Sequence, residues 1–466
     1  MRDATASADA LLLFGATGDL AKKKLWPALY QLSKEGLLDM PIVGIARSDW
    51  NDEQMRDRAR ESVRAAFHHE VDEDVLAAMA SRIRYVAGDY TNEATWPLVK
   101  ELTGGAKLPL SFLSIPPFLF DDVVKGLSSV GMTDSGRVIV EKPFGRDLAS
   151  AIELNDTLSK YLKEEQVFRI DHFLGKEPVQ NLLVFRFANS MLEPIWNRNH
   201  ISSVTITMAE SFGIEGRGSF YDEVGAIRDV VQNHLLQMVA LLAMEPPASN
   251  DQKSLRDEKV KVLKAMKRLD PEKAVRGQVE GYLDEKGVAE GSITETFVAL
   301  TLEIESWRWE GVPFYIRAGK ALKETVTEAI IEFKQPPRML FSEVGMCPEP
   351  NRLRFEMKPD DNITMTMQAK VPGLEMVSNP VDLSVDYEAA LGGGSPDAYE
   401  RLIADGLIGD ERLFARQDGV EAAWRIIEPL IESTAAPLPY AAGTWGPDEA
   451  DRVAPYAAGA RCDSDK

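Results

Sequence analysis

One short stretch near the amino terminus restricts the fold of this chain more than any other. Residues 10–14 (ALLLF) form an apolar run, as expected of a strand buried on both faces. The string 15–21 (GATGDLA) follows directly, and helix-forming residues continue to about Leu32. Strand, glycine turn and helix in this order are typical of a dinucleotide-binding unit, whose helix amino terminus attracts phosphates. The spacing is G-x-x-G rather than G-x-G-x-x-G, so a tight turn without a cofactor remains the alternative.

Further short apolar runs extend this pattern through the first third of the chain. They cover residues 41–46, 84–86, 110–115 and 137–140, and helical segments lie between them. Strands that alternate with helices predict a parallel, doubly wound sheet. Such sheets bind ligands at the carboxyl ends of their strands, where Pro116 and Lys142 are expected. An exposed loop lysine is the alternative interpretation of Lys142.

Arg47 and Ser48 follow the second predicted strand. In NAD sites an acidic residue near this point holds the ribose 2′-hydroxyl, whereas an arginine accommodates a 2′-phosphate. Arg47 therefore favours NADP, although Asp49 is close enough in sequence to keep NAD open.

The string 169–177 (RIDHFLGKE) places a histidine beside a carboxylate, with a Gly-Lys pair ahead of a predicted helix. Asp171 and His172 end a β-like run, and Pro178 suits a first helical position because its missing N–H has no partner there. The Asp-His pair is a candidate base or anion clamp. The Gly-Lys pair is a candidate phosphate seat, because the amino terminus of a helix attracts anions. A buried Asp–His pair that closes a strand is the structural alternative.

The rest of the chain predicts a mixed α+β domain, with strands over 203–210, 298–304, 314–317, 329–333 and 363–369. Glu210 shares the apolar face of the first of these strands, so it is either paired or a site residue, because an unpartnered buried acid is costly. Asp229 and His234 follow a glycine-rich loop and lie about 140° apart on a regular helix. They therefore face one small ligand only if it lies over the helix start or if that turn is irregular. A core histidine is the alternative.

Composition bounds the class of protein. A chain of 466 residues exceeds the size at which one core stops growing, so we expect a dinucleotide-binding domain over 1–171 and a second domain over 172–466. The net charge of −21 argues against nucleic acid and anionic membranes as partners. The longest apolar run, 235–244, is too short to span a bilayer. Cys347 and Cys462 are the only cysteines, which fits a reducing cytoplasm better than a disulfide framework.

These motifs, in this order, resemble the glucose-6-phosphate dehydrogenase family, the NADP-linked oxidoreductases that open the oxidative pentose phosphate pathway of glucose metabolism. The resemblance runs from about Leu11 to Pro447 and rests on the strings FGATGDLAKKK, EKPFGRDL, RIDHFLGKE, ESFGIEGRGSFYDEVGAIRDVVQNHLLQ, FYIRAGKAL, PDAYERL and WGP. It implies a Rossmann-like doubly wound domain followed by an α+β substrate-binding and dimerisation domain with a large, mainly antiparallel sheet. It also implies a cis Lys142-Pro143 bond. The sequence does not settle the oligomeric state, but such a sheet would suit a homodimer or a dimer of dimers, and the expected location is cytoplasmic.

The resemblance assigns roles to individual residues. His234 is implied to be the general base that takes the proton of the C1 hydroxyl as hydride leaves C1, and Asp171 is implied to orient it. The 6-phosphate is implied to bind His172 and Lys176. Other substrate contacts are implied for Glu210, Asp229, Lys142, Lys320 and Lys24. Cofactor contacts are implied for Gly15, Thr17, Gly18, Asp19, Leu20, Arg47, Ser48, Pro116 and Lys142, with Thr17 and Arg47 at the 2′-phosphate. No metal is required, because the ring oxygen of the sugar lets hydride leave unaided.

Two positions depart from the family pattern. Phe173 stands where tyrosine is usual, which removes a hydroxyl expected near the phosphate, and Lys358 stands where glutamine is common near the sugar. Loss of one hydrogen bond to a charged group costs ~1.5–3 kcal/mol, so we expect a raised Michaelis constant for the sugar phosphate. Two alternatives remain, namely a dehydrogenase that prefers NAD or uses both cofactors, and a non-catalytic paralogue that senses NADPH or a sugar phosphate.

Overall fold

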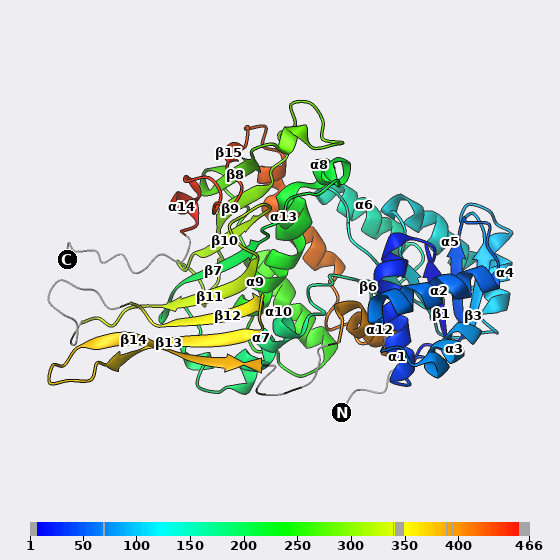
Figure 1. Ribbon diagram of the computed structural model, residues 1–466, viewed down its shortest axis with the longest axis horizontal. Helices are drawn as coiled ribbons and strands as arrows, with labels where there is room; N and C mark the ends of the chain where they lie inside the picture. Colours follow the sequence, from blue (N-terminus) through cyan, green and yellow to red (C-terminus); the bar gives the residue numbers. More distant parts are fainter. Residues whose placement is uncertain are drawn as a thin grey trace. The chain divides into compact units, whose positions relative to one another are not determined.

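The computed structural model describes residues 7–68, 70–338, 340, 349–387, 390, 392 and 396–455, which form two compact units (Figure 1). Unit 1 contains residues 1–177, 247–257 and 395–421, and unit 2 contains 178–246, 258–394 and 422–466. The domain division expected at residues 171 and 172 stays a prediction. In the structure the first boundary between the two units lies between Glu177 and Pro178, and two later segments of the chain also belong to unit 1. Cys347 and Cys462 lie outside the described residues.

Unit 1 is built on a six-stranded parallel sheet with the order β3-β2-β1-β4-β5-β6. All residues of β1, β2 and β4 are buried, as expected of parallel strands covered on both faces. This sheet confirms the predicted doubly wound fold. The strands are β1 Ala10–Phe14, β2 Ile42–Ala46, β3 Ile83–Ala87, β4 Pro109–Leu113, β5 Arg137–Val140 and β6 Val167–Arg169.

Helices cover both faces of this sheet. Leu11 and Leu13 of β1 belong to a core that includes side chains of α1, α2, α3 and α12, whereas Phe14 contacts Trp96 of α4 on the other face. The helices are η1 Ala21–Leu25, α1 Trp26–Lys34, α2 Asp52–Phe67, α3 Glu73–Ser81, α4 Thr95–Leu102, η2 Pro117–Leu119, α5 Phe120–Ser129, α6 Leu148–Ser159, η3 Glu164–Gln166 and α12 Ala398–Ile408. Here η1 is a π-helix, and η2 and η3 are 3₁₀ turns. Late in the sequence, α12 joins unit 1, where the Ala8 N–H donates to the Leu407 carbonyl at 2.7 Å.

Unit 2 is built on a nine-stranded sheet with the order β14-β13-β12-β11-β7-β10-β9-β8-β15. Only the pairs β7–β10 and β8–β15 are parallel among these described strands, so the sheet is mainly antiparallel, as predicted. The strands are β7 Ile201–Ala209, β8 Ala274–Val279, β9 Phe297–Leu302, β10 Phe314–Gly319, β11 Val326–Phe333, β12 Arg352–Lys358, β13 Asn362–Lys370, β14 Ser378–Asp386 and β15 Leu438–Tyr440.

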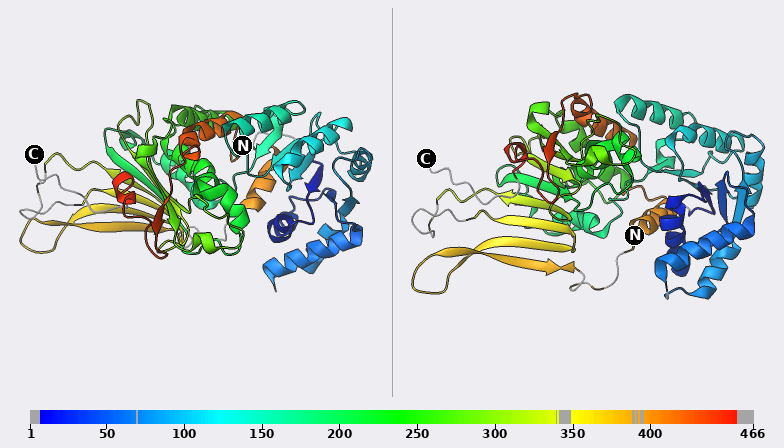
Figure 2. Two further views of the ribbon diagram at one scale, coloured as in Figure 1. Left: turned by 90° about the horizontal axis from the view of Figure 1, so that it is seen from above. Right: turned by 45° about the horizontal axis from the view of Figure 1, so that its top comes forward.

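The long strands of unit 2 extend beyond the helices that pack on its sheet (Figure 2). One contact between these helices and the sheet joins Phe185 of α7 to Phe355 of β12, whose ring centroids lie 5.2 Å apart. The helices lying wholly or partly in this unit are α7 Glu177–Ala188, η4 Glu193–Ile195, α8 Gly218–Ala226, η5 Ile227–Leu235, α9 Leu236–Ala243, α10 Gln252–Ala265, η6 Pro271–Lys273, η7 Tyr282–Asp284, α13 Gln417–Ile431 and α14 Ala450–Val453. Within the described ranges, no helix combines the length and hydropathy needed to cross a bilayer.

Candidate active site

The glycine turn after β1 is a tightly packed link between a strand and a helix. Gly15 has a φ of 73°, and a Cβ at this position would lie 2.1 Å from the Ser114 carbonyl oxygen, so only glycine fits. The Gly15 N–H donates to the Ile45 carbonyl at 2.9 Å and to the Tyr90 hydroxyl at 3.1 Å. Gly18 closes the turn by donating to the Gly15 carbonyl at 2.9 Å. The helix then starts at Asp19 and Leu20, as the dinucleotide motif requires.

Thr17 and Ser48 meet at the ends of β1 and β2. The Ser48 hydroxyl donates to the Thr17 hydroxyl oxygen at 3.2 Å, and Arg47 is exposed next to Ser48. Two hydroxyls near the backbone position of an exposed arginine are suited to a phosphate. Asp49 is also exposed, two residues further on. Pro116 follows β4, which pairs in parallel with β1, so it lies at the same edge of the sheet.

The segment after β5 contains a buried acid beside a predicted substrate lysine. The Lys142-Pro143 bond is cis, as the resemblance implied. Glu141 is 9% exposed, and its burial raises the pKa of this carboxyl to about 7, although a hydrogen bond from the Tyr399 hydroxyl acts in the opposite direction. Tyr399, from α12, was not singled out from the sequence, although it lies within the family-like string PDAYERL.

The string 169–177 folds into consecutive turns after β6. Asp171 is 2% exposed, and its Oδ1 accepts the Phe173 N–H at 3.0 Å. The ring of His172 stacks on Tyr399, with centroids 6.2 Å apart and planes 15° apart. Phe173 is itself buried, and the ammonium of Lys176 lies 4.7 Å from its ring centroid. Asp171, His172 and Lys176 are thus fixed in one turn region of unit 1.

One detail of this region differs from the sequence-based prediction, and one predicted substrate contact outside the string has a protein partner. Helix α7 begins at Glu177, so Pro178 is its second residue rather than its first. Lys24, a predicted substrate contact, forms an ion pair with Asp397 at 3.0 Å, and Asp397 also caps α12 by accepting the Tyr399 N–H at 2.9 Å. Lys24 is therefore engaged by the α12 segment in this structure.

A buried lysine organises the candidate substrate residues of unit 2. Lys320, at the end of β10, is 8% exposed and forms an ion pair with Glu210, which follows β7. Its ammonium also lies 3.9 Å from Oδ2 of Asp229. Tyr221 lies beside this cluster, with its ring centroid 5.7 Å from the same ammonium. Glu210, which was predicted to be either paired or a site residue, is thus paired with Lys320, and these three charged groups converge on one point.

An irregular helix settles the relation between Asp229 and His234. Both belong to η5, which is a π-helix rather than an α-helix. In a π-helix the hydrogen bonds join residues i and i+5, so residues five positions apart lie about one turn apart on the same side. Asp229 and His234 are five apart and therefore share a side, which the regular helical wheel denied. His234 is 4% exposed. Its pairing with Asp171, which belongs to unit 1, stays a prediction.

Burial also affects the groups around these residues. The hydroxyl of Tyr221 is buried, and burial together with the nearby carboxylates of Asp229 and Glu295 raises the pKa of Tyr221 well above its usual value. Tyr221 and Glu295 were not predicted as site residues. Among the described residues, no group of three or more His, Cys, Asp or Glu side chains is arranged to hold a metal ion.

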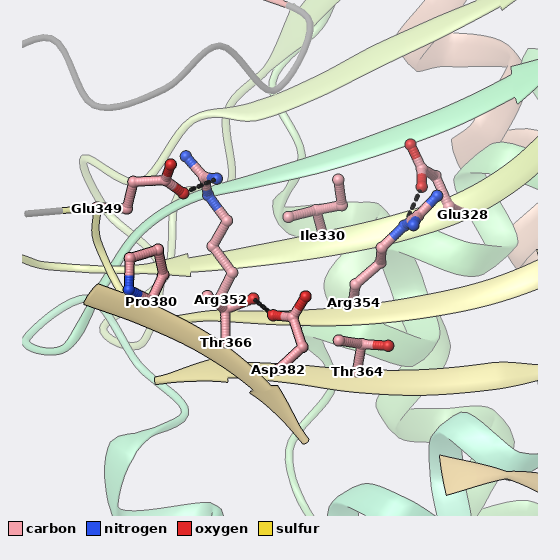
Figure 3. A pocket seen from close by; sticks show the side chains of 9 residues that line it. All are labelled: Glu328, Ile330, Glu349, Arg352, Arg354, Thr364, Thr366, Pro380 and Asp382. Atoms are coloured by element: carbon pink, nitrogen blue, oxygen red, sulfur yellow. Dashed lines mark hydrogen bonds and ion pairs between the residues drawn. The ribbon is translucent and has the colours of Figure 1, made fainter. Parts of the chain in front are cut away.

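A separate hollow lies on the sheet of unit 2 and contains none of the predicted site residues (Figure 3). Its volume is about 430 Å³. Arg352 and Arg354 of β12 line it, but Arg352 pairs with Glu349 at 3.2 Å and Arg354 pairs with Glu328 at 2.5 Å. Because both guanidinium groups already have carboxylate partners, the hollow is not a ready anion site. Lys358, the second predicted departure from the family pattern, is exposed at the end of β12.

Known proteins are similar to this one along nearly the whole chain. A family profile described as "Glucose-6-phosphate dehydrogenase, NAD binding domain" matches residues 12–181, and one described as "Glucose-6-phosphate dehydrogenase, C-terminal domain" matches residues 183–459. Glucose-6-phosphate 1-dehydrogenase 1 of Mycobacterium tuberculosis is 45% identical over 448 residues, which cover 96% of this chain and 95% of that protein.

Two solved structures are similar over the same extent. The crystal structure of glucose-6-phosphate 1-dehydrogenase from Mycobacterium avium has a TM-score of 0.89 and 44% identity, and covers 96% of both chains. A glucose-6-phosphate dehydrogenase in complex with its substrate glucose 6-phosphate has a TM-score of 0.90 and 38% identity, over 97% of this chain and 98% of that one.

Proposed function

Because the chain belongs to the glucose-6-phosphate dehydrogenase family, we propose that it oxidises D-glucose 6-phosphate at C1 to 6-phospho-D-glucono-1,5-lactone with NADP⁺ as the hydride acceptor. The observation that carries the proposal is the π-helix η5, which brings Asp229 and His234 to one side, with Asp229 in contact with Lys320. Buried ionisable groups in this arrangement are suited to hold a sugar and remove a proton from it.

His234 is assigned the role of general base. It accepts the proton of the C1 hydroxyl while the C1–H bond breaks and the C1–O bond becomes a carbonyl. Asp171 is assigned the carboxylate that orients His234 and stabilises its imidazolium, a role that the family resemblance implies. Its rigid placement in unit 1, buried and bonded to the Phe173 N–H, supports this assignment.

The remaining substrate residues bind the phosphate and the hydroxyls. We assign the 6-phosphate to His172 and Lys176, since His172 is held against Tyr399 and Lys176 is held over Phe173. We assign sugar hydroxyls to Glu210 and Asp229, whose carboxylates both contact Lys320. The other assigned substrate contacts are Lys142, Lys320 and Lys24, the last of which must exchange its Asp397 partner for the ligand.

The family profile over residues 12–181 supports a nicotinamide cofactor, and the residues present fit one. When bound, the nicotinamide accepts the hydride from C1. The turn at Gly15 and Gly18 leads into the amino terminus of the first helix, where a pyrophosphate is proposed to bind. Asp19, Leu20, Pro116 and Lys142 complete the proposed contacts. NADP⁺ is proposed rather than NAD⁺ because Thr17, Ser48 and Arg47 offer hydroxyl and guanidinium donors to a 2′-phosphate. The exposed carboxylate of Asp49 is the feature that favours NAD⁺ or dual use.

We also propose a cytoplasmic homodimer, or a dimer of such dimers, joined through the sheet of unit 2. Strand β14 exposes Val381, Leu383 and Val385 by 44%, 58% and 47%. These residues alternate along the strand and so share one face, which is an apolar row suited to a second copy. Light scattering that gave the mass of a single chain would contradict this assignment.

One assay distinguishes the proposed enzyme from its alternatives. NADPH and NADH formation is followed by absorbance with glucose 6-phosphate, for the wild type and for His234→Asn. We expect turnover mainly with NADP⁺ and a loss of about 10²–10⁴-fold in kcat for the variant, because general base catalysis typically contributes that much. Absence of turnover with either cofactor would favour the non-catalytic paralogue, preference for NAD⁺ would reassign the cofactor, and equal activity of the variant would remove His234 as the base.

A further inference from the structure

We propose that Glu295 is a positioning residue for η5, the π-helix that carries Asp229 and His234. The inference rests on the proposed function, because the chemistry of His234 is what the positioning would serve. Glu295 lies just before β9, far in sequence from the helix, and it is 5% exposed. Glu295, η5 and the residues that hold them all belong to unit 2.

The backbone breaks immediately before η5. Gly225 has φ 65° and ψ 175°, which only glycine adopts readily, and it interrupts the helical path between α8 and η5. A helix that starts afresh has N–H groups without partners inside the helix. The Ala226 N–H donates to the main-chain carbonyl of Glu295 at 3.0 Å, and the Ile227 N–H donates to its side-chain Oε1 at 3.0 Å. A single residue therefore caps the new helix twice, and its carboxylate also faces the positive end of the helix dipole.

The carboxylate of Glu295 is held from its other side. Arg276, on β8, lies 3.3 Å from Oε2 of Glu295, and both side chains are largely buried. The same guanidinium donates to the main-chain carbonyls of Ile293 at 2.7 Å and Ala435 at 3.0 Å, so it cannot follow a shift of the helix. The cap is thus fixed to the sheet, and η5 is fixed to the cap.

Thr296, the residue after Glu295, fixes the backbone of Lys320. The Lys320 N–H donates to the Thr296 carbonyl at 2.9 Å, and the Tyr440 hydroxyl contacts both the Lys320 carbonyl at 2.7 Å and the Thr296 hydroxyl at 2.8 Å. Glu295 and Thr296 therefore set the start of η5 and the backbone of Lys320 from adjacent positions. The contact between Lys320 and Asp229 at 3.9 Å depends on both.

The space around Gly225 does not accept a larger residue. A Cβ on Gly225 would lie 2.5 Å from Oε1 of Glu295, so any other residue at this position would push the carboxylate off the Ile227 N–H. The glycine break and the glutamate cap therefore form one device, whose parts lie far apart in the sequence.

The test compares Glu295→Ala and Glu295→Gln with a matched control, Glu328→Gln. Glu328, on β11, is 1% exposed and pairs with Arg354 at 2.5 Å, so it is an equally buried, arginine-paired glutamate that caps no helix. Two readouts are measured, namely steady-state kcat and KM for both substrates, and hydrogen exchange of the amides over residues 226–232. Glu295→Ala is expected to lower kcat by about 100-fold, the effect of a misplaced catalytic group, with an unchanged KM for NADP⁺ and faster exchange at these amides. Glu295→Gln is expected to keep most of kcat, because its carbonyl oxygen still accepts the Ile227 N–H.

The control variant is expected to keep the kcat of the wild type and its exchange over 226–232. The proposal is overturned if Glu295→Ala has the kcat and exchange of the wild type. It is also overturned if Glu295→Gln is as slow as Glu295→Ala, which would make the ion pair with Arg276 decisive, or if Glu328→Gln loses as much activity. A wild type without turnover would sink the proposed function, and the exchange data would then still decide whether Glu295 holds η5.

Discussion

The two units hold their candidate site residues by different means. In unit 1 the backbone does most of the positioning, because Gly15 sits against Ser114 and Gly175 sits against α12, where a Cβ would lie 2.8 Å from the Ala398 carbonyl. In unit 2 side-chain charges do a larger share, because Lys320 joins Glu210 and Asp229, and the Glu295 carboxylate caps η5 after the glycine break at Gly225. Close backbone approach selects glycine and leaves a mark in the sequence. Ion pairs use charged residues that are common on any protein surface, so the sequence does not reveal which of them position a site.

The largest expected effect tests the backbone half of this comparison. Gly15→Ala should lower the free energy of unfolding by about 2–5 kcal/mol, the sum of a positive φ and an overpacked contact. Gly36→Ala is the matched control, because Gly36 has the same φ of 73° but a Cβ there would meet nothing within 4 Å. It should cost only the conformational part, about 1–2 kcal/mol. Thermal unfolding and NADP⁺ binding by calorimetry measure both effects, and only Gly15→Ala should lose cofactor affinity.

Equal losses in the two variants would contradict this prediction. They would mean that the backbone at Gly15 yields to the added methyl group, and that the close approach to Ser114 does not fix the turn. The contrast between the units would then rest on Gly175 alone.

The same contrast explains how far the fold followed from the sequence. In unit 1 the predicted strands 10–14 and 137–140 coincide with β1 and β5, because parallel strands buried on both faces are continuous apolar runs. In unit 2 no strand was predicted at β8, β12, β14 or β15. The alternation of buried Leu353, Phe355 and Met357 with polar residues in β12 was a usable signal. In contrast, β14 contains Pro380 and is exposed along nearly all its length, so pairing with β13 rather than its own pattern defines it.

The candidate site was predictable to a similar, limited degree. Arg47 and Ser48 could be placed because strand ends are visible in the sequence. The shared side of Asp229 and His234 could not, because a helical wheel assumes 3.6 residues per turn and η5 is a π-helix. Tyr399 was missed for another reason, since its contacts with Glu141 and His172 join segments from distant parts of the chain.

A second prediction tests the comparison within unit 1, because this unit also contains a buried pair of side chains, Glu141 and Tyr399. Burial raises the pKa of Glu141 from 4.5 to about 7, so between these two values the folded protein keeps a proton that the unfolded chain has lost. Stability should therefore fall as the pH rises through this window. Glu141→Gln stays neutral, so its stability relative to the wild type should rise between pH 5 and pH 8 by on the order of 2–3 kcal/mol. Denaturant unfolding at a series of pH values measures this difference.

Tyr399→Phe supplies the companion measurement. The Tyr399 hydroxyl bond lowers the pKa of Glu141, so its removal should move the loss of stability to higher pH. Parallel pH profiles for the wild type and Glu141→Gln would show that Glu141 does not titrate in this window.

The smallest expected effect concerns Phe173, the position where the family resemblance predicts a tyrosine. Its ring is 2% exposed and lies 4.7 Å from the Lys176 ammonium, so a hydroxyl on this ring would be delivered close to a proposed phosphate ligand. Phe173→Tyr should lower KM for glucose 6-phosphate by about tenfold, since a hydrogen bond to a charged group is worth ~1.5–3 kcal/mol and tenfold corresponds to 1.4 kcal/mol. The kcat should change little, because the phosphate does not react. Phe333→Tyr, at the end of β11, should leave KM unchanged. An unaltered KM in Phe173→Tyr would mean that the ring and Lys176 already hold the phosphate as well as a hydroxyl would.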